Sequence, residues 1–274
     1  MNPLEWLLLR LSHAEETSLN AGPDFDFDAV CRRLLNDFPE LPNWIRGARV
    51  LDFGCGHGLQ AVAFAKLGAD HVLALDINED SLASGRREAV RNGVQDRVEF
   101  AVKPSADDLH RYDIVFSLNS MEHFSDPDAV LQTMASLLKP EGRLLVSFDP
   151  TWYSPWGAHM RFFTDVPWVH LLFPESTVMA VRARYRDDGA RRYEDVRGGL
   201  NKMSVARYER LLAASGLRTT AMRKVGIRGI RAFATIPVLR ELLVPRIISV
   251  SRIASAPAED IGPEQARTAM AAEA

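Results

Sequence analysis

The fold of this chain is restricted above all by a glycine-rich stretch, RVLDFGCGHG at residues 49–58. Apolar residues lead into Asp52 and then into three glycines at alternate positions, which predicts a buried strand that ends in a tight turn. Helical spacing resumes at residues 59–67. A strand, a glycine turn and a helix N-terminus in this order form a cradle for a small ligand, because glycine lets the backbone approach closely and free N–H groups point outward.

The segments around this stretch alternate between short apolar runs and helical patterns. An amphipathic helix is expected at residues 27–38, ahead of the glycine stretch. Further strands are expected at 71–77, 98–102, 112–118 and 143–148, with helices at 78–92 and 126–138 between them. Strands that alternate with helices require parallel crossovers, so the core is predicted to be a doubly wound, Rossmann-like α/β sheet.

The regular alternation stops after the fifth strand. Residues 149–202 form a long insertion rich in aromatic residues, which predicts a lid or substrate wall, with a packed structural excursion or an oligomer contact as alternatives. A helix follows at 204–214, and residues 217–227 and 246–253 predict the last two strands, with a short helix at 238–243 between them. This antiparallel C-terminal hairpin would complete a mostly parallel, seven-stranded sheet.

We therefore predict a single domain over residues 1–254. It would consist of N-terminal helices at 1–47, a ligand-binding core at 48–148, the insertion at 149–202, and a closing helix and hairpin at 203–254. The tail at 255–274, which is rich in Ala, Pro and Glu, is predicted to be disordered. The oligomeric state is left open.

Composition excludes several classes of protein. With 47% apolar residues, 25% charged residues and a net charge of −3, the chain is typical of a globular protein and does not indicate a nucleic-acid partner. Its two cysteines form no disulfide framework, so a cytoplasmic location is expected. No apolar run is long enough to predict a transmembrane segment. The apolar N-terminal residues 3–11 lack the features of a secretory signal; they predict a helix that packs on the domain, with peripheral membrane contact as the alternative.

Two aspartates decide between two kinds of nucleotide ligand. The NAD fingerprint requires a third glycine where this chain has Leu59. Asp52, two residues before the first glycine, can accept hydrogen bonds from an ammonium group, which NAD lacks. Asp76 ends the second strand about 20 residues after the glycines, at the spacing from which a carboxylate reaches a ribose diol. A ligand with an ammonium group at one end and a nucleoside at the other is S-adenosylmethionine.

With these motifs in order, residues 50–148 resemble a class I S-adenosylmethionine-dependent methyltransferase of the small-molecule group. The fourth strand with its loop at 113–123 and the turn at 138–146 also match this pattern. Family members often carry an acidic residue after the third strand to hold the adenine amino group. Here that loop reads KPSAD at 103–107, so Ser105 or a backbone group is expected to take the contact. The implied cofactor contacts are Asp52, Gly54, Cys55, Gly56, Gly58, Asp76, Ile77, Ser105, Ala106 and Asn119.

Histidines supply the candidate catalytic groups. Methyl transfer needs alignment of the reactants, and a base only where the acceptor loses a proton. His123 directly follows the fourth strand and is the first candidate for that base, with a structural role in the loop as the alternative. His159 and His170 lie in the insertion and could also serve as base or acceptor contacts, although each alone fits a hydrogen-bonded structural role better. The spacing of the three histidines matches no metal-ligand template, so no metal is expected.

The segment from residue 179 to 246 is basic, with sixteen Lys or Arg against six Asp or Glu. Such a segment forms either a solvated basic face or a surface that attracts an anionic substrate. The predicted activity is transfer of a methyl group from S-adenosylmethionine to a small-molecule acceptor. The acceptor class includes anionic molecules, and oxygen is the atom expected to receive the methyl group. N- or C-methyl transfer and a non-catalytic cofactor-binding partner module remain alternatives, and Leu59 disfavours an NAD-dependent oxidoreductase.

Overall fold

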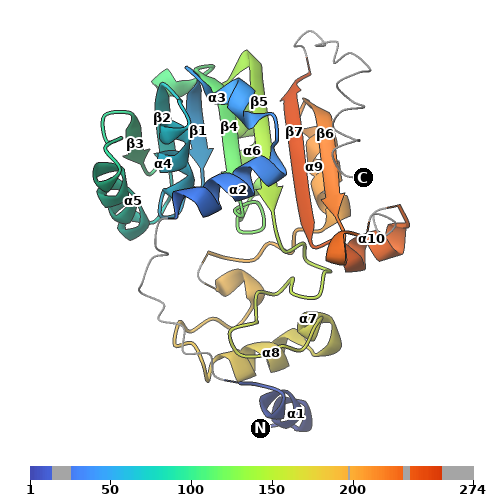
Figure 1. Ribbon diagram of the computed structural model, residues 1–274. Coiled ribbons are helices and arrows are strands. Elements are labelled where there is room, and N and C mark those ends of the chain that lie inside the picture. Colours follow the sequence, from blue (N-terminus) through green and yellow to red (C-terminus); the bar gives the residue numbers. More distant parts are fainter. Residues whose placement is uncertain (14–25, 197, 231–234, 255–274) are drawn as a thin grey trace.

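The sheet at the centre of the molecule has seven strands in the order β3-β2-β1-β4-β5-β7-β6 (Figure 1). The computed structural model describes residues 1–13, 26–196, 198–230 and 235–254. Strands β1 to β5 are mutually parallel, and β7 runs antiparallel to both of its neighbours, β5 and β6. The predicted sheet and its antiparallel C-terminal hairpin are therefore confirmed. The strand bounds are β1 Arg49–Phe53, β2 His71–Leu75, β3 Val98–Ala101, β4 Tyr112–Leu118, β5 Leu138–Phe148, β6 Leu217–Val225 and β7 Arg246–Ile253.

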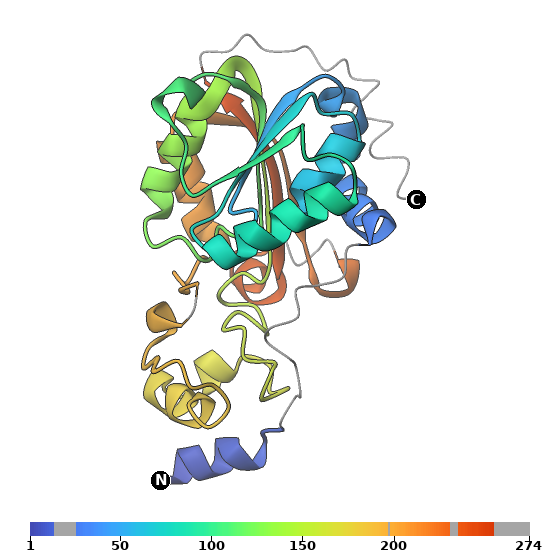
Figure 2. The same ribbon diagram turned by 90° about the vertical axis from the view of Figure 1, so that its left-hand side faces the viewer.

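Helices cover both faces of the sheet, as Figure 2 shows from the side. One face carries α2 (Phe27–Asp37), α3 (Leu41–Ile45), α4 (Leu59–Lys66) and α5 (Glu79–Arg91), and the other carries α6 (Pro127–Leu137) and α9 (Val205–Ala214). The short α10 (Pro237–Leu243) lies between β6 and β7 in the chain. Local signals set the helix starts, because side chains of Asn78 and Asp126 accept backbone N–H groups at the first turns of α5 and α6.

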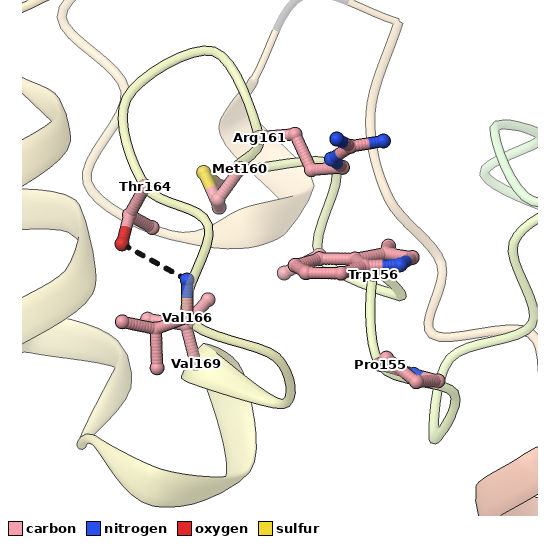
Figure 3. A pocket seen from close by; sticks show the side chains of 8 residues that line it. Pro155, Trp156, Met160, Arg161, Thr164, Val166 and Val169 are labelled. Atoms are coloured by element: carbon pink, nitrogen blue, oxygen red, sulfur yellow. Dashed lines mark hydrogen bonds between the residues drawn. The ribbon is translucent and has the colours of Figure 1, made fainter. Parts of the chain in front are cut away.

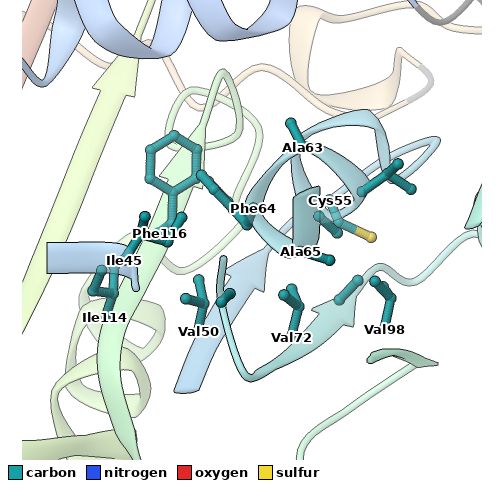
Figure 4. Packing of buried hydrophobic residues seen from close by; sticks show 14 of the residues in the cluster. Ile45, Val50, Cys55, Ala63, Phe64, Ala65, Val72, Val98, Ile114 and Phe116 are labelled. Atoms are coloured by element: carbon teal, nitrogen blue, oxygen red, sulfur yellow. The ribbon is translucent and has the colours of Figure 1, made fainter. Parts of the chain in front are cut away.

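The core is divided between these two faces by the alternation of side chains along each strand. Val50 pairs in register with Val72 and with Ile114, and all three are buried beneath α2 to α5 (Figure 4). The neighbouring residues Leu51 and Val115 are buried on the opposite face, beneath α6 and α9. Burial on both faces explains why these strands appear in the sequence as nearly continuous apolar runs.

The insertion lies at the end of the sheet toward which β1, β4 and β5 point (Figure 1). It contains the helices α7 (Val169–Leu172) and α8 (Glu175–Arg182). The N-terminal helix α1 (Pro3–Arg10) packs on α8, and Leu8 is fully buried there. The insertion thus has a hydrophobic cluster separate from the two sheet faces, which includes Leu8, Trp152, Phe163, Val178, Tyr193 and Leu200.

Four predicted strand bounds were wrong, and two of them only in that β2 ends at Leu75 and β3 at Ala101, before residues 77 and 102. Strand β5 starts at Leu138 rather than at residue 143, because the chain passes directly from α6 into the sheet and Leu138 pairs with Tyr112. Strand β6 ends at Val225, since a 3₁₀ turn begins at Ile227. The predicted disordered tail, 255–274, lies outside the described residues. None of the described helices combines the length and the apolar character needed to cross a bilayer.

Candidate active site

The glycine cradle after β1 has a backbone that only glycine tolerates at its tightest point. Gly54 has a φ of +79°, and a Cβ atom added there would lie 2.5 Å from Oγ of Ser120. Gly56 also has a positive φ, of +51°, but faces open space within 4 Å. The Gly54 and Cys55 N–H groups both donate to the Leu75 carbonyl at 2.8 Å. Two backbone hydrogen bonds therefore hold the turn against the end of β2, whereas the space beside Gly56 is empty.

Asp76 joins this turn to the start of α5. One carboxylate oxygen accepts the Gly56 N–H at 2.8 Å, and the other accepts the Asn78 N–H at 2.9 Å. Each carboxylate oxygen can accept a second hydrogen bond, so Asp76 keeps capacity for a ligand. The side chain is partly buried and lies at the carboxyl end of β2, where doubly wound sheets bind their ligands.

Asp52 is the buried carboxylate of the cradle. Its residue is 1% exposed, and its Oδ2 atom has no hydrogen-bond partner. Burial, with a smaller contribution from the charge of Asp76, raises the pKa of Asp52 to about 8. A buried carboxylate without a partner is costly, and a cationic group beside it removes that cost. The cradle therefore fits a ligand that carries an ammonium group and ribose hydroxyls.

The other predicted cofactor residues lie around the same edge of the sheet. Cys55 is buried, and burial raises the pKa of its thiol. Ile77 is 87% exposed, and Oδ1 of Asn119 is buried without a hydrogen-bond partner. The hydroxyl and the N–H of Ser105 both donate to Asp108, at 2.8 and 2.7 Å. The Ser105 hydroxyl, which the sequence suggested for the adenine, is thus engaged in capping the short turn that contains Ala106.

A second group of polar side chains gathers between β4 and the insertion. Each of Glu122, His123 and His159 has one carboxylate oxygen or ring nitrogen that lies within 4.8 Å of the corresponding atoms of the other two. The two imidazole rings lie 5.3 Å apart between centroids, and Nδ1 of His123 lies 2.7 Å from the Gly199 carbonyl oxygen. The structure therefore brings together the two histidines that the sequence suggested as catalytic, although they are far apart in the chain.

Burial shifts the protonation of this group, which we call the Glu-His-His cluster (Glu122, His123 and His159). Glu122 is 3% exposed, and neither of its carboxylate oxygens has a hydrogen-bond partner. Burial raises the pKa of Glu122 to about 8, against an opposing contribution from its own backbone N–H; Asp149 adds to the shift and Arg33 opposes it. Burial, assisted by His123, lowers the pKa of His159 to about 4, so its ring is neutral near pH 7.

Glu122 is the member of this cluster that the sequence did not single out as a candidate. Glu122 was available as a signal, because it directly precedes His123 at the ligand-facing end of a strand. Nε2 of His170 lies 2.6 Å from the Trp152 carbonyl oxygen, and the ring packs on that of Trp152. His170 therefore has the hydrogen-bonded structural role that the sequence favoured for it.

Many basic side chains of residues 179–246 are paired with acids. Arg246 lies 3.2 Å from Asp37 and 3.1 Å from Asp149, close to the end of β5. Arg182 forms a two-pronged pair with Asp188 at 2.6 Å for each contact. Further pairs involve Arg192, Lys202, Arg223, Lys224 and Arg240. Most of these acids belong to the same segment, and only Asp37, Asp149 and Glu175 come from outside it, so most of the basic excess remains.

A small hollow within the insertion is separate from both polar groups. Figure 3 shows Trp156 beneath Arg161, whose guanidinium lies 4.9 Å from the ring centroid. None of the lining residues belongs to the cradle or to the Glu-His-His cluster; they are Pro155, Trp156, Ala158, Met160, Arg161, Thr164, Val166 and Val169. The hollow is not part of the candidate cofactor site.

The doubly wound sheet, its antiparallel last strands and the Asp52–Asp76 cradle define a class I S-adenosylmethionine-dependent methyltransferase. The chain belongs to the family described as a methyltransferase domain, whose sequence profile matches residues 25–221.

Relatives and solved structures agree with this class. The chain is 39% identical over 109 residues to the ubiquinone biosynthesis O-methyltransferase of Neisseria meningitidis serogroup C, and the match covers 38% of this chain and 44% of that protein. The fold is similar to that of the PH0226 protein from Pyrococcus horikoshii OT3, with a TM-score of 0.55, 20% identity and coverage of 84% and 93% of the two chains. It is also similar to an S-adenosylmethionine-dependent methyltransferase from Mesorhizobium loti, with a TM-score of 0.52, 20% identity and coverage of 80% and 99%.

Proposed function

We propose that this chain transfers the methyl group of S-adenosylmethionine to an oxygen atom of a small-molecule acceptor. The observation that carries the proposal is the Asp52 carboxylate, which is buried and lacks a partner for Oδ2 behind the glycine turn. The cofactor supplies a methyl group already activated by its sulfonium, so the protein's task is to hold the reactants in line and exclude water.

The cradle residues would hold the two polar ends of the cofactor. Asp52 would accept hydrogen bonds from its ammonium group, and Asp76 would accept them from its ribose hydroxyls. Asp76 is well prepared for this, because two backbone N–H groups already fix its carboxylate. Ile77 offers an exposed apolar side chain next to it, which would pack on the nucleoside. The predicted contacts of Ser105, Ala106 and Asn119 belong to the same proposal.

His123 is the proposed base for an acceptor hydroxyl. A carbonyl oxygen only accepts hydrogen bonds, so the contact with Gly199 places the ring proton on Nδ1 and leaves a lone pair on Nε2. That nitrogen is 3.9 Å from the Glu122 carboxylate. His159 is held neutral by burial and would help to orient the acceptor or take its proton.

The insertion is the proposed wall of the acceptor site. It lies at the ligand-binding end of the sheet and supplies His159 and the Gly199 carbonyl to the Glu-His-His cluster. Oxygen is the proposed acceptor atom because the relatives matched at 39% identity carry the name O-methyltransferase. A phenol or related hydroxyl compound of ubiquinone biosynthesis is therefore the first acceptor class to test.

Two measurements test the proposal. Calorimetry should show binding of S-adenosylhomocysteine, and labelled S-adenosylmethionine should transfer its label to a member of a panel of hydroxyl, amine and carbon acceptors. Label on a hydroxyl compound supports the proposal. Label only on amines or carbon would overturn the acceptor assignment. Cofactor binding without labelling of any panel member would favour the non-catalytic partner module, and a response to NADH alone would reverse the cofactor assignment.

A further inference from the structure

We propose that the Glu-His-His cluster binds a divalent transition-metal cation of the zinc type. Two imidazoles and one carboxylate form a donor set that zinc accepts, with a further position left for a solvent or substrate oxygen. The three donor atoms already converge within 4.8 Å of one another. Binding would draw them together around the ion.

The state of Glu122 points independently to a cation. The residue is 3% exposed, and both of its carboxylate oxygens lack a hydrogen-bond partner. The two charged groups that act on it from neighbouring elements are Asp149 and Arg33, and they lie 3.7 Å from each other as an ion pair. Their charges oppose one another, and the basic group nearest to the carboxylate is the His123 ring, whose Nε2 lies 3.9 Å from Oε1 of Glu122. Neither oxygen of this buried carboxylate has a hydrogen-bond partner among the described residues. A bound cation would supply the missing partner.

The two histidines present their free nitrogen atoms in the manner of metal ligands. His123 donates Nδ1–H to the Gly199 carbonyl at 2.7 Å, a contact that orients the ring and leaves the Nε2 lone pair available. Nε2 of His159 is buried and has no hydrogen-bond partner. Zinc-binding histidines commonly have the arrangement seen at His123, in which one nitrogen binds a backbone oxygen and the other binds the ion.

The sequence indicated no metal because the ligands come from distant segments. Glu122 and His123 follow β4, whereas His159 lies in the insertion and has a φ of +58°. A cation bound by all three would tie the insertion to the sheet. This inference deepens the proposed function, because the open position of the ion would bind the acceptor oxygen beside the cradle. With the ion bound, Nε2 of His123 would be a ligand, so the ion and not His123 would favour loss of the hydroxyl proton. Cation binding itself does not depend on methyl transfer.

The test is titration of the chelator-treated full chain with Zn²⁺ by calorimetry and with Co²⁺ by visible absorption, in the absence of cofactor. We expect one Zn²⁺ per chain, a rise in melting temperature on Zn²⁺ addition, and a Co²⁺ spectrum typical of low coordination number. Glu122→Gln and His159→Gln should each weaken Zn²⁺ binding by about 10-fold or more, given that loss of an outer-shell partner alone costs about 10- to 100-fold.

The matched control is His71→Gln, because His71 starts β2 at the opposite end of the sheet and pairs with Glu99. It should bind Zn²⁺ like the parent chain. Glu122→Gln should fold without metal, since it removes a buried charge and keeps the side-chain shape. The proposal is overturned if the parent chain binds no Zn²⁺ or Co²⁺, or if both ligand variants bind like the parent. Binding of S-adenosylhomocysteine measured in the same metal-free samples tests the proposed function separately.

Discussion

The carboxylate of Asp52 makes the stability of the ligand-free chain depend on pH. Its pKa is raised to about 8 by burial and by Asp76, against an ordinary value near 3.8. The folded state therefore binds this proton more tightly than the unfolded state does. The free energy of unfolding should fall as the pH rises from about 4 to about 8, and should level off above the folded pKa.

Asp52→Asn should remove this pH-dependent fall in the free energy of unfolding, because the amide stays neutral at every pH. The variant should gain stability relative to the parent chain by an amount that grows from pH 5 to pH 8, on the order of a few kcal/mol. Urea unfolding at the two pH values, without cofactor, measures the difference. If the free energy of unfolding changed with pH in the same way for both proteins, the raised pKa of Asp52 would be contradicted. The same variant should bind S-adenosylhomocysteine more weakly.

Asp76→Ala should weaken the binding of S-adenosylhomocysteine by about 1–3 kcal/mol, the cost of losing buried hydrogen bonds to a carboxylate. Calorimetry measures the change. Asp70→Ala is the control, because Asp70 is exposed and directly precedes β2 at the end of the sheet remote from the cradle. Equal affinity of the two variants would sink the ribose assignment. Melting temperatures would show whether the turn held by Asp76 has been preserved.

The proximity of Asp52 and Asp76 could be predicted from the sequence, whereas the proximity of Glu122 and His159 could not. Asp52 and Asp76 follow neighbouring parallel strands, so their proximity follows from the order of the elements. The meeting of Glu122 with His159 depends on how the insertion folds back on the sheet, and no periodicity in residues 149–202 encodes that path. The engagement of Ser105 with Asp108 also depends on local side-chain geometry.

At the scale of elements, the contact between α5 and β3 depends on two glycines that face one ring. A Cβ atom added at Gly58 would lie 2.5 Å from Phe100 Cε1, and one added at Gly85 would also overlap this ring. Gly58 precedes α4, and Gly85 lies within α5. The ring of Phe100 therefore occupies the space that both glycines leave, and this close packing sets how near α4 and α5 approach the sheet.

Gly85→Ala should destabilise the chain by about 1–3 kcal/mol, although alanine is the better helix former by about 1 kcal/mol, because the added methyl group overpacks the Phe100 ring. Chemical denaturation measures the loss. The double variant Gly85→Ala with Phe100→Leu should recover part of it, since the smaller side chain makes room. If the two substitutions changed the free energy of unfolding additively, overlap with the Phe100 ring would not be the cause of the destabilisation.

Most elements followed from sequence patterns, and the exceptions have physical reasons. The buried strands and the caps at Asn78 and Asp126 are local signals, so helix and strand positions were predicted closely. The start of β5 was missed because the segment KPEG looks like a turn; its four residues lie in an irregularity of the ladder, between the Leu138–Tyr112 and Arg143–Ile114 pairs. The separate cluster of the insertion was not predicted, since its apolar residues have no regular spacing.

At the scale of the whole molecule, the N-terminal helix belongs to the insertion rather than to the sheet. Leu8 is fully buried in the insertion's cluster, and residues 11–13 contact the insertion through the Thr164 hydroxyl and the Phe163 carbonyl. Leu4, Trp6 and Leu7 of the same helix remain exposed. The stability of the insertion should therefore depend on a segment more than 100 residues away in the chain.

Leu8→Ala should destabilise the insertion's cluster by about 2–5 kcal/mol, the usual cost of a large-to-small substitution in a core. Hydrogen exchange should show faster exchange in α8, while β1 and β4 exchange as in the parent chain. Leu4→Ala is the control, because Leu4 is on the same helix but exposed. Equally faster exchange in the sheet would show that the insertion and the core unfold together.

The order in which the chain is synthesised determines when α1 can dock on α8. The ribosome makes α1 first, and α8 follows only after all of β1 to β5. At ordinary elongation rates, α1 would wait on the order of ten seconds or more for its partner. During that time Leu8 and the apolar residues around it are exposed on a nascent chain, and they offer a binding site for chaperones. Strands β1 to β5 can pair in that interval, α8 can dock on α1 only afterwards, and β6 and β7 are made later still.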